Sequence, residues 1–274
     1  MRNILTILCV ISLLAYGCGT SGSKEESSSS SESAESSSIK EAVEREFKYP
    51  IPTAYQVTQL LQTAEAGFVL GITNSPENVD RYETQKDKAL NLGIYGADLS
   101  YSSTYNRQEE TMGFLNASKK LVDDLQMSGI FTQEMVTRVE NNISNKDSLI
   151  LIVTESFYDT YEYLNQNGQN KLSILVVTGS WIEGLYITTQ LAISSNYDKR
   201  IMDIVAKQKT AVNQLFDLLQ KHSGDEDISE VLPFINYLKE TYSTIDENSP
   251  LTQEQLDDIF NNVDKTRSDI VGDA

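Results

Sequence analysis

The stretch Leu172–Ile193, LSILVVTGSWIEGLYITTQLAI, decides the fold of this 274-residue chain. Glu183 is the only charged residue between Lys171 and Asp198. A helix that is apolar on nearly all sides is buried in a large domain or in a membrane. The stretch is long enough to span a bilayer, but a bilayer would place Glu183 near its centre at high cost, and Ser, Thr and Gln recur along it. We therefore predict the buried core helix of a globular domain.

Apolar residues at helical spacing, bounded by capping signals, continue on both sides of this stretch. No segment alternates with period two between turn dipeptides, so we predict no sheet. Short loops favour antiparallel neighbours, which predicts an all-α, multi-helix up-and-down bundle of about nine helices. Besides the central stretch, we expect helices over 53–71, 75–105, 106–129, from 132, and over 146–168, 196–222, 229–244 and 252–263.

A second central helix is expected around residues 91–98, NLGIYGAD. Its two glycines, Gly93 and Gly96, each cost about 1 kcal/mol relative to alanine inside a helix. The pattern predicts either a close helix–helix approach or a kink at this place.

The two central stretches also resemble each other. Residues 98–103, DLSYSS, match residues 184–189, GLYITT, at an offset of 86, and the helices around each follow in a similar order. Amphipathic helices also resemble one another by chance. Duplication of a four-helix unit is therefore one of two interpretations of this similarity.

Two acids on the central helices are the candidate site. A lone buried carboxylate must be paired, hydrogen-bonded or protonated, and aromatic rings with one or two carboxylates suit a sugar, an amine or a cation. The candidate pocket consists of Asp98, Glu183, Tyr95, Tyr101, Tyr186 and Trp181.

Two other interpretations apply to Asp98 and Glu183. In the first, which we favour, nearby hydroxyl groups satisfy both acids inside the core, since the chain has 14 tyrosines. In the second, the two carboxylates serve a hydrolase, as in glycosidases, and must then face one solvent-reached cleft about 5–10 Å apart.

Composition excludes several classes of site. The formal charge is −18, which argues against nucleic acid because that partner needs a basic surface. His222 is the only histidine and is expected to cap a helix C-terminus. With only Cys9 and Cys18 besides, we expect no metal and no cofactor, and we favour a non-catalytic role.

The N-terminal residues are typical of an export signal. Arg2 precedes an apolar run, Ile4–Ala15, that has the length of a signal peptide. Gly17-Cys18 resembles the end of a bacterial lipoprotein signal, in which the cysteine is lipidated and becomes the mature N-terminus. Ordinary secretion with cleavage after Gly17 is the alternative. The resemblance implies a signal peptide over 1–17 and lipidation of Cys18, with palmitate among the acyl chains.

A serine- and glutamate-rich segment follows Cys18. Residues 19–40 contain eleven serines and four glutamates, a composition that cannot bury enough apolar surface to offset its ordering entropy. We expect a flexible tether over 18–46 and a single all-α domain over 47–274.

Together, the signal, the acidic serine tether and the helical stretch 91–101 make the chain similar to an all-α lipoprotein of the Bacteroidota type. The resemblance implies a lipid anchor in the outer membrane, periplasmic or surface-exposed, and carries no activity with it. We expect a membrane-tethered binding or accessory module in the cell envelope, with a protein partner or a small polar ligand. The alternative is a structural or assembly component that acts through helix–helix contacts.

Overall fold

The computed structural model describes residues 54–127, 132–246 and 249–272. All of them belong to one compact unit. The predicted signal peptide, Cys18 and the tether lie outside the described residues, so the predictions made for them stay predictions.

The described residues form helices and no strands, which confirms the all-α prediction. There are ten α-helices and one 3-10 helix among them. In chain order the elements are α2 (Ala54–Thr63), η1 (Pro76–Arg81), α3 (Gln85–Thr104), α4 (Gln108–Asp124), α5 (Gln133–Asn142), α6 (Lys146–Gln166), α7 (Asn170–Ser194), α8 (Lys199–Ala206), α9 (Lys209–Lys221), α10 (Glu226–Ser243) and α11 (Gln253–Val271).

Two of the predicted helices are interrupted. The helix expected over 75–105 is η1 followed by α3, because the side chain of Thr84 accepts a hydrogen bond from the Asp87 N–H and starts a new helix. The helix expected over 196–222 is α8 and α9, which are separated at Lys207 and Gln208. The expected cap at Asn106 is also wrong, since this residue adopts a left-handed backbone conformation with φ of 55°.

Other capping signals are confirmed. Thr132 caps α5, and Thr252 with Gln255 forms a complete capping box at the start of α11. His222 is the C-cap residue of α9, as predicted. α11, however, continues eight residues beyond the predicted end at Val263, because it stops only where Gly272 takes up a left-handed conformation.

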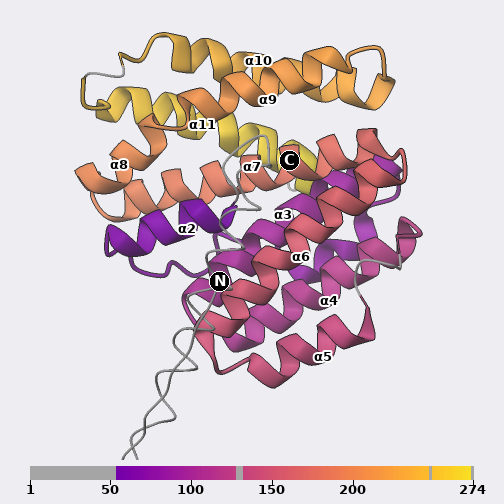
Figure 1. Ribbon diagram of the computed structural model, residues 1–274. Coiled ribbons are helices and arrows are strands. Elements are labelled where there is room, and N and C mark those ends of the chain that lie inside the picture. Colours follow the sequence, from indigo (N-terminus) through magenta and orange to yellow (C-terminus); the bar gives the residue numbers. More distant parts are fainter. Residues whose placement is uncertain (1–53, 128–131, 247–248, 273–274) are drawn as a thin grey trace, which may run out of the picture. The chain divides into compact units, whose positions relative to one another are not determined.

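α7 occupies the centre of the described unit (Figure 1). On one side of α7, α10 packs against both α9 and α11, while α3, α4 and α6 lie on the other side. Consecutive helices pack together in the pairs α3–α4, α6–α7 and α9–α10, as an up-and-down order requires. The most extensive contact, however, joins α3 and α7, which are far apart in the sequence.

The central helix is buried along its length. Every residue from Leu172 to Thr189 is buried, and α7 is the one described helix that is long and apolar enough to cross a membrane. Its apolar window is entirely covered by the rest of the domain, so the prediction of a buried core helix is confirmed.

Glycines allow α3 and α7 to approach at backbone distance. A Cβ atom added to Gly93 would lie 2.0 Å from the carbonyl oxygen of Val176, and one added to Gly179 would lie 2.0 Å from the carbonyl oxygen of Leu90. Both contacts are with main-chain atoms, which cannot rotate out of the way. The close approach expected at Gly93 is therefore confirmed, and Gly179 is its counterpart on the other helix.

The two contacts are reciprocal. Gly93 and Gly179 differ by 86 positions, and so do their contact residues, Leu90 and Val176. The offset is the one that relates the two similar sequence stretches. The neighbouring helices make a similar set of contacts, because α2 packs on α3 and α7, while α6 packs on α7 and α3. A local two-fold relation between α2–α3 and α6–α7 is what duplication of a helical unit would produce.

Alanine at either glycine is expected to destabilise the protein. Gly93→Ala and Gly179→Ala force the helices apart, and overpacking of this kind costs about 1–3 kcal/mol. The two losses in free energy of unfolding, measured with urea, should be similar because the contacts are reciprocal. Gly224→Ala is the control, since its added Cβ meets nothing within 4 Å. Unchanged stability of both core variants would contradict the close approach.

Candidate functional site

The two predicted acids come together at the contact of α3 and α7. Asp98 lies on α3 and Glu183 on α7, and neither side chain has any exposed surface. The two carboxyl groups are close enough for the negative charge of Glu183 to raise the pKa of Asp98. The two residues are 85 positions apart in the chain and yet meet at this contact.

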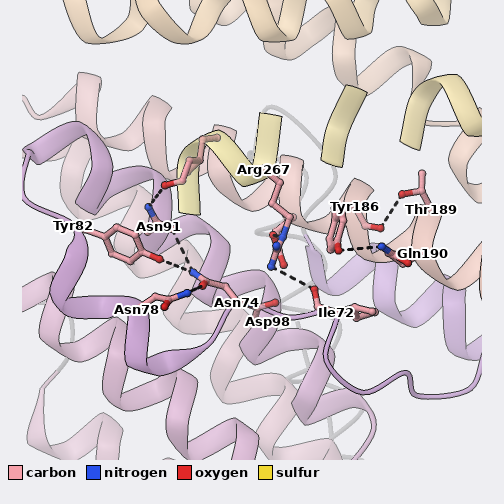
Figure 2. A network of polar contacts seen from close by, with 12 residues as sticks. Ile72, Asn74, Asn78, Tyr82, Asn91, Asp98, Tyr186, Thr189, Gln190 and Arg267 are labelled. Carbon is pink, nitrogen blue, oxygen red and sulfur yellow. Dashed lines mark hydrogen bonds and ion pairs between the residues drawn. The ribbon is translucent and has the colours of Figure 1, made fainter. Parts of the chain in front are cut away.

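Arg267 on α11 neutralises Glu183. Its Nε atom donates to Glu183 Oε2 over 2.7 Å, and both side chains are buried. The guanidinium group also lies 4.3 Å from the ring centroid of Tyr186, one turn along α7 from Glu183. Its third contact is a long hydrogen bond of 3.4 Å from a terminal nitrogen to the carbonyl oxygen of Ile72. Figure 2 shows Arg267 reaching from α11 towards Ile72.

The segment that precedes η1 donates a hydrogen bond to Asp98. The backbone N–H of Asn74 donates to Asp98 Oδ2 over 3.1 Å. The side chain of Asn74 is itself fixed, since its amide donates to the Tyr82 hydroxyl over 2.9 Å and its carbonyl accepts from Asn78 over 2.9 Å (Figure 2). These bonds orient the backbone of the segment towards the acid.

Asn91 ties the same network to the last helix. Its amide donates to the carbonyl oxygen of Ile270 over 3.1 Å and to that of Asp87 over 2.9 Å, while its own carbonyl oxygen lies 3.4 Å from the Asn74 amide. α3, α7, α11 and the segment before η1 are thus joined by one buried polar network.

Burial and the nearby charges shift the pKa values of Asp98 and Arg267. Burial raises the pKa of Asp98 well above its ordinary value and the negative charge of Glu183 raises it further, although Arg267 and the Asn74 N–H oppose both effects. Burial disfavours the charged guanidinium of Arg267, but attraction to Glu183 outweighs burial and the pKa of Arg267 rises. Arg267 is therefore fully charged, and Asp98 is a weaker acid than an ordinary aspartate.

The tyrosines do not serve as the partners of the acids. The Tyr95 hydroxyl donates to the carbonyl oxygen of Ser75, and the Tyr101 hydroxyl accepts from the Val69 N–H. The Tyr186 hydroxyl accepts from Gln190. The favoured expectation that hydroxyl groups satisfy Asp98 and Glu183 is therefore wrong. A guanidinium and a backbone N–H take that place because they compensate negative charge better.

Trp181 completes the six predicted site residues. It is buried, and its indole N–H has no hydrogen-bond partner among the described residues. Burial raises the pKa of Tyr95 and of Tyr101, so both phenols are neutral around pH 7. The candidate pocket residues are thus parts of the buried core.

Two open clefts lie elsewhere on the described surface. One, of about 410 Å³, lies at α5 and α6 and is lined by residues that include Glu134, Arg138 and Asp159. The other, of about 640 Å³, is lined by residues of α8 and of the segment before α11, among them Lys199 and Leu251. Neither cleft is lined by any of the six predicted site residues.

Arg267 and Asn74 are not among the residues that the sequence pattern predicts for the site. Arg267 was overlooked because the last helix was expected to end at Val263. Gly272 was the available signal, since a glycine just past a helical pattern marks its C-terminus. Asn74 acts through its backbone N–H, so its side-chain type gave no indication of this role.

Comparison of the chain with protein-family models, with curated proteins and with solved structures finds no match. The chemistry of the site therefore rests on its own geometry. Among the described residues, no group of three or more His, Cys, Asp or Glu side chains could hold a metal ion.

Removal of the arginine tests the energetic role of the network. Arg267→Met leaves Glu183 buried without its cation, and the loss of one partner from a buried pair costs about 3–5 kcal/mol. Chemical denaturation should show this loss in the free energy of unfolding. The matched control is Arg138→Met, which breaks the exposed pair with Glu155, where about 0–1 kcal/mol is expected. Equal effects of the two substitutions would contradict the assigned role of Arg267.

Proposed function

We propose that this protein is a lipid-anchored, non-catalytic binding or accessory module of the cell envelope. The observation that carries the proposal is the complete burial of Asp98 and Glu183 against Arg267. Asp98 and Glu183 are the residues for which the sequence predicts a functional role. In the structure they are part of a buried cluster that joins helices of the core. Residues of the outer surface therefore remain as the places where a partner or ligand could bind.

The hydrolase alternative is disfavoured by the same observation. A pair of catalytic carboxylates must reach both a substrate and a water molecule. Asp98 and Glu183 have no exposed surface, and Arg267 occupies one face of Glu183. The described residues leave no opening through which a sugar ring could reach the two acids.

Anchoring is supported by the N-terminal sequence. An apolar segment of signal-peptide length precedes Cys18, and a serine- and glutamate-rich tether follows it. Lipidation with more than one acyl chain gives stable membrane attachment. The predicted tether between anchor and domain would let the acidic domain reach a partner at a distance from the membrane.

The described surface offers places for a protein partner. Three large apolar side chains are exposed: Leu60 on α2, Leu70 in the segment before η1, and Tyr237 on α10. Exposed apolar side chains supply binding energy when a partner covers them. A partner protein therefore accounts for them better than a small polar ligand does.

Cross-linking in cells tests the binding role. A photo-reactive amino acid is placed at position 60, 70 or 237 of the full chain, and at the exposed Lys221 of α9 as a control. We expect at least one apolar position to give a covalent adduct with a different protein, while Lys221 gives none. An adduct of twice the mass of the chain would support the assembly alternative instead. The absence of adducts at all three apolar positions would contradict the proposal.

Replacement of the cysteines tests the anchor separately. Cys18→Ser removes the acceptor for the lipid, so the protein should move from the membrane fraction to the soluble fraction and lose metabolic labelling with palmitate. Cys9→Ser is the matched control, because Cys9 lies in the predicted signal peptide and should leave both properties unchanged. Membrane attachment of Cys18→Ser at the wild-type level would overturn the anchor.

A further inference from the structure

One oxygen atom on each buried acid lacks a donor. Asp98 Oδ1 and Glu183 Oε1 are inaccessible to solvent and have no conventional hydrogen-bond partner among the described residues. The second oxygen of each acid is satisfied, Asp98 Oδ2 by the Asn74 N–H and Glu183 Oε2 by Arg267. A buried polar atom without a partner usually marks a missing water, ion or proton.

The charges of the cluster point to a proton. Two ionised carboxylates and one guanidinium leave a net charge of −1 in a region without solvent. An uncompensated charge is strongly disfavoured there, and two carboxylates that share a site cannot both ionise readily. One proton makes the cluster neutral. It also turns one of the two unpaired oxygens into the donor that the other requires.

We propose that Asp98 and Glu183 bind one proton between them and that this proton is a structural component of the core. Placed on Asp98 Oδ1, it donates to Glu183 Oε1 and pairs both remaining oxygens. Asp98 Oδ2 is then still free to accept from Asn74, and Glu183 Oε2 from Arg267. Loss of the proton leaves two negative charges facing each other between α3 and α7.

With this proton the polar contacts form a closed ring. The chain of contacts runs from the Asn74 N–H through Asp98, Glu183 and Arg267 to the carbonyl oxygen of Ile72. Ile72 and Asn74 are only two residues apart, so the ring ends on the segment where it began. The proton supplies a donor between Asp98 Oδ1 and Glu183 Oε1, which is the one position in the ring where two acceptors face each other.

Among the described residues, Arg267 and the Asn74 N–H are the groups that compensate the negative charge of the pair. On α3, Tyr95 and Tyr101 lie near Asp98, and burial raises the pKa of both phenols, which stay neutral. On α7, Tyr186 lies near Glu183, and burial raises its pKa as well. From α11, Arg267 supplies the cation, while Asp264 adds only negative charge beside Tyr186.

The expected pH dependence has a defined sign. Because the pKa of Asp98 is higher in the folded than in the unfolded protein, the folded state holds the proton more tightly. The contribution to stability is complete below the ordinary value of 3.8. It falls as the pH rises from that value through the raised pKa of the folded state.

The test compares wild type with Asp98→Asn across this range of pH. The amide of the variant can donate to Glu183 and its oxygen can accept from Asn74, so it imitates the protonated acid without titrating. We expect the ratio of the wild-type to the variant unfolding constant to rise by up to tenfold per pH unit within the window. Asp217→Asn, on the exposed face of α9, controls for the loss of a surface charge and should show no such change.

A spectroscopic measurement keeps the proposal testable if the variant folds poorly. At neutral pH, the infrared spectrum of the wild-type protein should contain the C=O stretch of a protonated carboxylic acid, which disappears as the pH is raised towards unfolding. An unfolding ratio independent of pH, or a wild-type spectrum without this band at neutral pH, would show that both acids are ionised and would overturn the proposal.

Discussion

The structure depends on a buried cluster of two acids and one guanidinium at the contact between its central helices. Asp98 and Glu183 sit at the contact of α3 and α7, and Arg267 arrives from α11. Buried ion pairs are weak evidence of net stability, since desolvation offsets much of the attraction. Their value here is specificity, because few arrangements of these helices can bring all three groups together.

The second constraint is geometric. Gly93 and Gly179 let two helical backbones touch, and the contact leaves no room for a side chain on either side. This close approach places α3 and α7 in a fixed register, which in turn brings the two carboxyl groups into contact. The glycines and the acids are thus parts of the same interface. The presence of a glycine or an acid at these positions is understood only when both helices are considered together.

Much of this arrangement could be predicted from sequence, for reasons visible in particular residues. The lone charge of Glu183 in an apolar stretch identified the core helix, and the glycines around Tyr95 indicated a close approach. The partners of the acids could not be found in the same way. A hydrogen bond from a backbone N–H does not depend on the type of side chain, so the sequence gives no sign of it. Arg267 lies beyond the predicted end of the last helix, because α11 is about two turns longer than predicted.

The ring of polar contacts also has a consequence for the order of folding. Arg267 follows Glu183 by 84 residues and Ile72 by 195. A chain that emerges with its N-terminus first therefore presents both acids long before their cation is available. Until α11 is present, the two carboxyl groups at the contact of α3 and α7 lack the counter-ion that Arg267 supplies. The cluster is therefore complete only once α11 has been synthesised and has packed against α7.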